Sequence, residues 1–296
     1  MKEKNDLFRG TGVAIVTPFS DSGKIDFPSY EKILNHIILG GAEFIVVLGT
    51  TGEASTLSAE EKKELIRFSV EKINGRVSLV VGVGGNSTSD VSQALAKIPS
   101  TGVDAILSVC PYYNKPQQEG IYQHFKAVSS ATALPVIIYN VPGRTSSNIS
   151  AATCLRLSDD CPNIIGIKEA SGNFDQIGTI LKERSGGFLV LSGDDGLTLP
   201  LLSMGADGVI SVVANAYPQQ FSDMVRLSLA GNFKAARSLH FRLIDFIHAL
   251  FADGSPAGIK AALEVKKLCL NNLRLPLVRV NETTYQKIKS LVDLIG

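Results

Sequence analysis

The sequence contains no tryptophan and only four cysteines among its 296 residues. These cysteines, at positions 110, 154, 161 and 269, form no Cys-x-x-Cys pair, which argues against a disulfide scaffold or a zinc ribbon and fits a reducing compartment. No uncharged apolar run reaches the roughly 18 residues of a membrane span, and no apolar segment of a signal peptide follows the charged start MKEKNDLFRG. These absences predict a soluble, cytoplasmic protein that does not enter a membrane.

The sequence also has no excess of charge of either sign. It carries 29 Lys and Arg against 28 Asp and Glu, a net charge of +1. Nucleic acids and anionic membranes are attracted by basic surfaces, so we expect neither as a partner. The four histidines form no HxH or HExxH pattern, and neither GxSxG nor GxGxxG occurs. The sequence therefore predicts no bound metal and no dinucleotide cofactor.

What the chain does contain is a regular series of short runs rich in Val, Ile and Leu. Each interval between two runs is long enough for one strand, one helix and two short loops, which is the unit of a parallel sheet. Eight such units are the number that closes a barrel, so we predict an α/β fold, a (β/α)8 TIM barrel. An open doubly wound sheet would need a nucleotide fingerprint after its first strand, and VAIVTPFSDSG has none. The eight runs begin near Val13, Phe44, Val77, Asp104, Leu134, Asn163, Phe188 and Gly208.

Several helix ends can be read from the sequence. Ser58 followed by Glu61 three residues later predicts a capping box at the start of one helix. The glycine pairs at 40–41 and 186–187 predict the ends of two others.

The last part of the chain has no further strand pattern. Three amphipathic stretches, at 233–254, 256–272 and 283–296, predict three helices. About 65 residues are too few to form a stable unit alone, so this bundle is expected to pack on the barrel or on a neighbour. We therefore predict a barrel over residues 1–232 that carries the active site, and a C-terminal helical extension over 233–296.

A single lysine interrupts the apolar run NIIGIKEA. Strand alternation places Gly166, Lys168 and Ala170 on one face and Glu169 on the other, so Lys168 and Glu169 are not expected to pair. If Lys168 points into the barrel, its low-dielectric surroundings favour the neutral amine, which is a nucleophile. The small neighbours leave room for a ligand. We interpret Lys168 as a Schiff-base lysine rather than an ion-paired residue at a strand end.

Other polar groups follow the predicted strand ends, where barrel enzymes carry their active residues. Tyr139 could pass protons to and from an imine, or could be a buried tyrosine with a satisfied hydroxyl. The guanidinium of Arg144 suits a carboxylate, although a surface arginine is the alternative. The GTTGE run at 49–53 could hold a small carboxylate or form an ordinary turn. Tyr112 and Tyr113 fit either a site or an interface.

Taken together, these runs resemble the pyruvate-dependent class I aldolase family, to which N-acetylneuraminate lyase also belongs. The resemblance covers nearly the whole chain, and it is the combination that is specific, since GTTGE alone would be weak. It implies condensation of pyruvate with L-aspartate 4-semialdehyde to 4-hydroxy-tetrahydrodipicolinate in lysine (diaminopimelate) biosynthesis. No cofactor is implied, because the imine of Lys168 with pyruvate is itself the electron sink. The runs that carry the resemblance are GVAIVTPF, GTTGE, PYYNKPQQEG, YNVPGRT, GIKEASG, LSGDD and GVISVVAN.

The same resemblance implies residue roles. Lys168 would form the imine, and Tyr139 would shuttle protons with Thr50 and Tyr113 as relay partners. Tyr113 would reach across a dimer interface into the neighbouring site. Thr51, with the surrounding backbone, would bind the pyruvate carboxylate, and Arg144 would receive the carboxylate of the semialdehyde. The backbone carbonyls expected near the lysine, on the substrate side, belong to Gly193 and Ile210.

Two other functions fit the sequence less well. A lyase or aldolase acting on a sugar acid such as N-acetylneuraminate would share Lys168 and Tyr139, but Arg144 after the YNVP turn favours a small acidic aldehyde. A non-catalytic barrel that binds a small carboxylate, as a sensor or assembly protein, would be suggested by loss of the lysine or the tyrosine. Both are present.

The resemblance also bears on regulation. Asn86 and Tyr112 match the family's lysine feedback site, and Asp90 replaces a glutamate there. Ala59 and Lys62 stand where sensitive members tend to carry histidines. Because Lys62 would repel the ammonium group of the inhibitor, we predict weak or absent inhibition by lysine.

An assembly is implied as well. The family tends towards tetramers built from two tight dimers, so we expect a homotetramer or a homodimer. The sequence does not decide between them.

Overall fold

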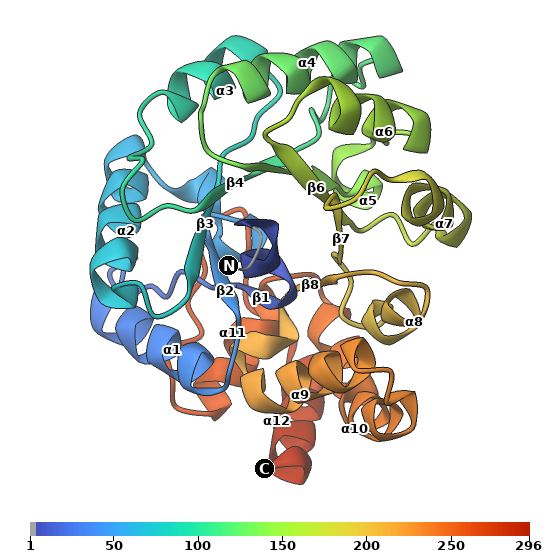
Figure 1. Cartoon of the computed structure of the whole chain (residues 1–296). Coiled ribbons are helices and arrows are strands. Elements are labelled where there is room, and N and C mark those ends of the chain that lie inside the picture. Colours follow the sequence, from blue (N-terminus) through green and yellow to red (C-terminus); the bar gives the residue numbers. More distant parts are fainter. Residues whose placement is uncertain (1–3) are drawn as a thin grey trace.

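The computed structural model describes residues 4–296 and contains a closed barrel of eight parallel strands in the order β1 to β8 (Figure 1). Each strand pairs with the next, and β8 pairs with β1. The predicted (β/α)8 barrel is therefore confirmed. The strands are β1 (Gly10–Ala14), β2 (Phe44–Val47), β3 (Ser78–Gly82), β4 (Ala105–Val109), β5 (Val136–Asn140), β6 (Ile164–Glu169), β7 (Leu189–Ser192) and β8 (Gly208–Ser211).

Helices follow the strands and surround the barrel (Figure 1). The α-helices are α1 (Phe27–Leu39), α2 (Ala59–Ile73), α3 (Thr88–Leu95), α4 (Gln118–Ser130), α5 (Pro142–Thr145), α6 (Ala151–Asp160), α7 (Phe174–Glu183), α8 (Thr198–Ser203), α9 (Pro218–Leu229), α10 (Phe233–Phe251), α11 (Ala257–Val265) and α12 (Glu282–Ile295). Short 3-10 helices are η1 (Lys4–Phe8), η2 (Thr50–Gly52), η3 (Ala54–Thr56) and η4 (Val213–Asn215).

The helix ends test the capping predictions. The capping box of Ser58 and Glu61 is present at the start of α2, and Gly41, with φ of 86°, follows α1 as predicted. The expected glycine end of α7 is wrong. This helix ends at Glu183, and Arg184 turns into extended backbone, where its guanidinium binds the carbonyl of Phe188 and the carboxylate of Asp207.

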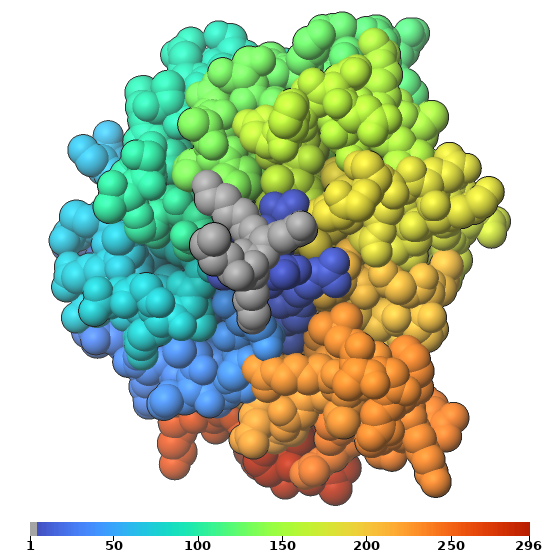
Figure 2. Space-filling model, viewed as in Figure 1, coloured from blue at the N-terminus to red at the C-terminus, as the bar shows by residue number. Residues whose placement is uncertain are grey.

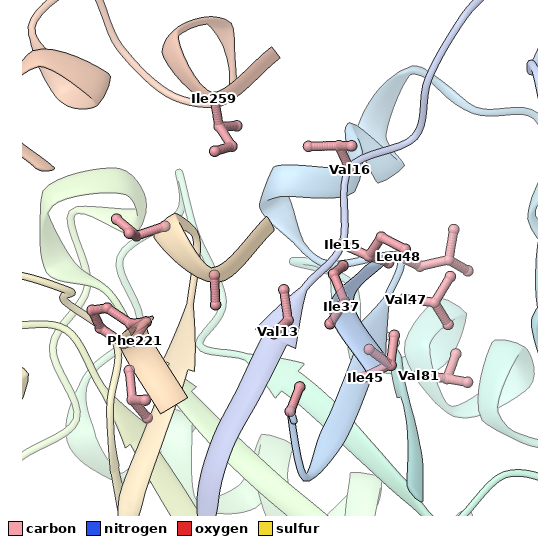
Figure 3. Close-up of a cluster of buried hydrophobic side chains, with 14 of the residues drawn as sticks. Val13, Ile15, Val16, Ile37, Ile45, Val47, Leu48, Val81, Phe221 and Ile259 are labelled. Atoms are coloured by element: carbon pink, nitrogen blue, oxygen red, sulfur yellow. The ribbon is translucent and has the colours of Figure 1, made fainter. Parts of the chain in front are cut away.

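The apolar side chains form two cores. The larger core lies between the strands and the surrounding helices, and Figure 3 shows part of it, where Val13 and Ile45 of the barrel lie among helix residues that include Ile37 and Phe221. The smaller core fills the barrel interior. Phe8 of η1 closes one end of that interior against Phe44, with the ring centroids 5.7 Å apart. In Figure 2 the dark-blue N-terminal residues fill the centre of this face.

The C-terminal extension consists of three helices, α10, α11 and α12, as predicted, but α11 ends at Val265, before the predicted end at residue 272. Helix α10 packs on α9 and α12, and α11 packs on α12, so the extension covers the side of the barrel near α1 and α9 (Figure 1). The division into units at 232/233 stays a prediction. No helix among residues 4–296 is both long and apolar enough to cross a bilayer.

Candidate active site

Lys168 and Tyr139 lie side by side inside the barrel. They are directly paired across β5 and β6, and Lys168 Nζ lies 4.3 Å from the centroid of the Tyr139 ring. Only 5% of Lys168 and 7% of Tyr139 is exposed. Lys168 therefore points into the barrel, the condition on which its interpretation as a nucleophile depended, and its amine faces an aromatic ring rather than a carboxylate.

Glycines allow the neighbouring backbone to pack closely around this lysine. A Cβ atom at Gly193 would lie 3.1 Å from Cε of Lys168 and 2.7 Å from Cβ of Ala170. Gly166 faces β7 so closely that a Cβ there would lie 2.6 Å from the carbonyl oxygen of Leu189. Glycine at 193 therefore lets the backbone after β7 approach the lysine side chain. Ile210 of β8 belongs to the same barrel interior.

The GTTGE run forms a tight turn after β2. Thr50 and Thr51 begin the 3-10 helix η2, with Thr50 exposed and Thr51 buried. The first N–H groups of a helix have no acceptor inside it, so they are available to an anion. The hydroxyl of Thr17 donates to the carbonyl of Gly52 at 2.7 Å and holds the turn against the end of β1.

Arg144 lies in the short helix α5, which directly follows the strand of Tyr139. Its side chain is exposed, and Nη2 donates to the carbonyl of Ser255 at 3.3 Å. The remainder of the guanidinium fork is free of carboxylate partners among the described ion pairs, which leaves its charge available to an acidic ligand.

Tyr113 does not reach Tyr139 within one chain. Its side chain is 87% exposed, and its φ of 73° puts a bulky residue in the left-handed region, which is uncommon. The hydrogen bonds of residues 4–296 include none that joins Tyr113 or Thr50 to the hydroxyl of Tyr139. The predicted proton relay is therefore incomplete in a single chain.

The residues matched to the lysine feedback site lie on neighbouring loops. Asn114 Nδ2 donates to the carbonyl of Asn86 at 3.3 Å, which brings the loop after β3 beside the Tyr112 segment. Asp90 lies in the first turn of α3 and is exposed. The structure thus brings Asn86 and Tyr112 into one surface region, with Asp90 one helical turn further along the chain.

One charged cluster was missed by the sequence reasoning. Lys260 of α11 and Glu53 of the GTTGE turn form an ion pair with both side chains completely buried. Burial lowers the pKa of Lys260, and the charge of Glu53 opposes that shift. Glu53 also accepts a hydrogen bond from the backbone N–H of Arg274 at 3.1 Å. A lone lysine in the apolar run PAGIKAALEV is the signal that could have found this pair.

Arg274 extends the cluster to α2. Its guanidinium pairs with Glu61, whose pKa it lowers to about 2, and it lies 4.4 Å from the ring of Phe19. All four cysteines are buried and free. Among residues 4–296, no group of three or more His, Cys, Asp or Glu side chains is arranged to hold a metal.

Comparisons with known proteins agree over the full length. Residues 7–295 match the model of the dihydrodipicolinate synthetase family. The 4-hydroxy-tetrahydrodipicolinate synthase of Parabacteroides distasonis is 48% identical over 284 residues, which are 96% of each chain. The crystal structure of dihydrodipicolinate synthase from Thermotoga maritima aligns with a TM-score of 0.95 at 40% identity and covers 98% of this chain and 99% of that one.

A further solved structure is that of the Cyanidioschyzon merolae enzyme with lysine bound. It has a TM-score of 0.95 and 38% identity, and it covers 98% of this chain and 99% of that one. The barrel, the inward lysine and these full-length matches agree, and the chain belongs to the dihydrodipicolinate synthetase family.

Proposed function

We propose that this protein condenses pyruvate with L-aspartate 4-semialdehyde to 4-hydroxy-tetrahydrodipicolinate, the product for which its relatives are named. The observation that carries the proposal is the contact between Lys168 and Tyr139 inside the barrel. A buried lysine amine beside a phenol has the groups that imine chemistry needs.

Lys168 begins the reaction. Its Nζ attacks the keto carbon of pyruvate with its lone pair, and loss of water from the carbinolamine gives an imine that is protonated on nitrogen. This cation draws electrons from the methyl carbon, which loses a proton to form an enamine. The enamine carbon attacks the aldehyde, and the amino group of the semialdehyde then attacks the imine carbon and releases Lys168 as the ring closes. No cofactor is required for this sequence of steps.

Tyr139 carries the protons of these steps. Its ring lies against Lys168, and we assign to its hydroxyl the proton transfers to and from the imine. Thr50 and Tyr113 are the proposed relay to solvent. Because Tyr113 is exposed in one chain, it enters the relay only when a second copy presents it, which requires at least a dimer. We propose a homodimer or a homotetramer of two dimers.

The two substrates use different anion sites. Thr51 and the N–H groups of its turn bind the pyruvate carboxylate, and the backbone carbonyls of Gly193 and Ile210 are assigned as substrate contacts near the lysine. Arg144 receives the carboxylate of the semialdehyde, with an exposed guanidinium above the barrel. We place the protein in the cytoplasm. We expect weak or absent inhibition by lysine, because Lys62 stands where lysine-sensitive members of the family tend to carry a histidine and would repel the ammonium group of the inhibitor.

The deciding experiment is borohydride reduction in the presence of pyruvate, followed by mass analysis of the peptides. We expect a stable adduct on Lys168 and none on Lys260. A folded protein that gives no adduct would overturn both the synthase and any sugar-acid lyase, and would favour a carboxylate-binding barrel.

Turnover separates the remaining alternatives. We expect turnover of aspartate semialdehyde and not of N-acetylneuraminate. Arg144→Lys should reduce kcat/KM for the semialdehyde by about 10- to 100-fold and leave pyruvate trapping unchanged. The substitution removes the bidentate hydrogen bonds between the guanidinium and the carboxylate of the semialdehyde, and pyruvate does not use them. Preferential turnover of the sugar acid would contradict the proposal.

A further inference from the structure

Glu169 follows Lys168 directly and points away from the barrel interior. Its side chain is 1% exposed, and the partners that the structure gives it are all neutral N–H groups. Burying a carboxylate without a cation is costly unless its oxygens are well supplied with hydrogen bonds. A charged group at this position therefore calls for an explanation beyond the requirements of the fold.

Three donors surround the carboxylate. Asn140 Nδ2 lies 3.1 Å from each carboxylate oxygen, Gln176 Nε2 donates at 2.9 Å, and the backbone N–H of Ser171 donates at 2.8 Å. Asn148 completes the cluster, because its Oδ1 accepts from Asn140 at 2.8 Å and its Nδ2 donates to Gln176 at 2.9 Å.

This cluster lies immediately behind the reacting pair. Asn140 and Glu169 are paired across β5 and β6 one step after Tyr139 and Lys168. Because side chains alternate along a strand, the Asn140–Glu169 contact on the outer face clamps the same two strand ends whose inner face carries Tyr139 and Lys168. Gln176 connects this contact to the start of α7.

We infer that Glu169 is a positioning residue, whose buried carboxylate, gripped by the amides of Asn140 and Gln176, holds Lys168 against Tyr139 for imine formation. The inference rests on the proposed function of that pair. An ionised carboxylate accepts hydrogen bonds only, so it matches three converging donors, whereas a glutamine in its place would turn an N–H towards one of them.

A single and a double variant test whether position 169 must offer only acceptors to its three donors. In Glu169→Gln the new amide N–H opposes the N–H of Gln176. In the double variant Glu169→Gln with Gln176→Glu, the new glutamine donates to the new carboxylate, and its oxygen still accepts from Asn140 and Ser171. The double variant therefore restores the donor–acceptor match between positions 169 and 176 and moves the charge to α7. It gives up the weaker bond of 3.3 Å that Gln176 Nε2 donates to Oδ1 of Asn148.

The readout is the rate of borohydride-trapped adduct formation across a range of pyruvate concentrations. We expect Glu169→Gln to lower the saturating rate by about 100-fold with little change in the half-saturating concentration, because small displacements of a reacting group cost this much. The double variant should return to within about threefold of the wild type, because the two positions are coupled.

Asp207→Asn is the matched control. Asp207 is also a buried carboxylate, but it lies at the opposite end of the barrel, where it accepts hydrogen bonds from Val190 at 2.9 Å and pairs with Arg9 and Arg184. We expect this variant to lower the melting temperature and leave the trapping rate unchanged. A purely structural role for Glu169 would make the two variants behave alike.

Several results would contradict the positioning role of Glu169. A folded Glu169→Gln protein that traps within about twofold of the wild type, or a double variant with no recovery, would overturn it. If Glu169→Gln does not fold, Gln176→Ala, which removes one donor from a partly exposed position, should still slow trapping, and an unchanged rate would overturn the inference. A wild-type protein that gives no adduct would instead overturn the proposed function.

Discussion

Lys260 and Glu53 join the C-terminal extension to the turn after β2 through an ion pair that no water reaches. Lys260 Nζ also donates to the carbonyl of Asn272 at 2.8 Å and lies 4.2 Å from the ring of Phe19. The backbone N–H of Arg274 contacts the second oxygen of Glu53. The turn after β2 is thus held from outside the barrel by residues that follow it by more than 200 positions.

Breaking this pair on one side should be costly. Lys260→Met leaves the carboxylate of Glu53 buried without its cation, and we expect it to lower the free energy of unfolding by about 3–5 kcal/mol. Urea denaturation followed by circular dichroism measures the change.

The matched double variant should recover stability. With Glu53→Gln added to Lys260→Met, neither charge of the pair remains buried, and the glutamine oxygen still accepts from the backbone N–H of Arg274. A double variant as unstable as Lys260→Met would mean that the charge of the pair, and not the unpaired partner, determines the stability.

Gly193→Ala should obstruct imine formation. The new methyl group would lie 3.1 Å from Cε of Lys168 and 2.7 Å from Ala170, so the lysine must move. We expect the rate of pyruvate trapping to fall by about 10- to 100-fold. Gly196→Ala in the same loop is the control, because its Cβ would meet no atom closer than 3.4 Å. Equal effects of the two variants would contradict the crowding argument.

A mixing experiment tests the shared site. Lys168→Ala and Tyr113→Ala should each be nearly inactive alone. After unfolding together and refolding, half of the dimers contain one chain of each kind, and one of their two sites then has both native residues. We expect about a quarter of the wild-type activity, as the symmetry of an isologous dimer requires. A mixture no more active than its components would show that Tyr113 does not act across an interface.

Asp195 should make stability depend on pH. Burial raises the pKa of Asp195 from 3.8 to about 6, against the hydrogen bonds that it accepts from the N–H groups of Val212 and Val213. The folded state therefore binds this proton more tightly than the unfolded chain. Protonation of Asp195 therefore stabilises the folded state. This contribution is fully present below about pH 4 and is lost as the pH rises through about 6, which lowers the free energy of unfolding by about 3 kcal/mol.

Asp195→Asn isolates that contribution. The amide does not titrate, so the free energy of unfolding of the variant relative to the wild type should rise by about 3 kcal/mol between pH 4 and pH 7. Urea midpoints measured at four pH values across this range provide the comparison. A difference that stays constant with pH would show that Asp195 titrates alike in the folded and unfolded chains.

The repeating strand pattern determined most of the fold. All eight strands were expected within three residues of their observed starts, and the largest difference is Val13 against Gly10. The reason is that each buried parallel strand is a continuous apolar run, and the segments between the strands show the hydrophobic periodicity of helices. The end of α7 was predicted wrongly, because the tertiary contacts of Arg184 with Phe188 and Asp207 override the local preference of the glycine pair.

The sequence predicted the residues of the site less completely than the fold. Lys168 and Lys260 give the same signal, a single lysine within an apolar run, and the sequence alone could not separate them without the resemblance. Both amines lie over an aromatic ring, and only the tertiary structure shows that Lys260 also has a carboxylate partner, whereas Lys168 has none among the ion pairs of residues 4–296. The physical reason is that Glu53 and Lys260 meet across a separation of 207 residues, and a local pattern carries no information about which distant charge will share a low-dielectric site.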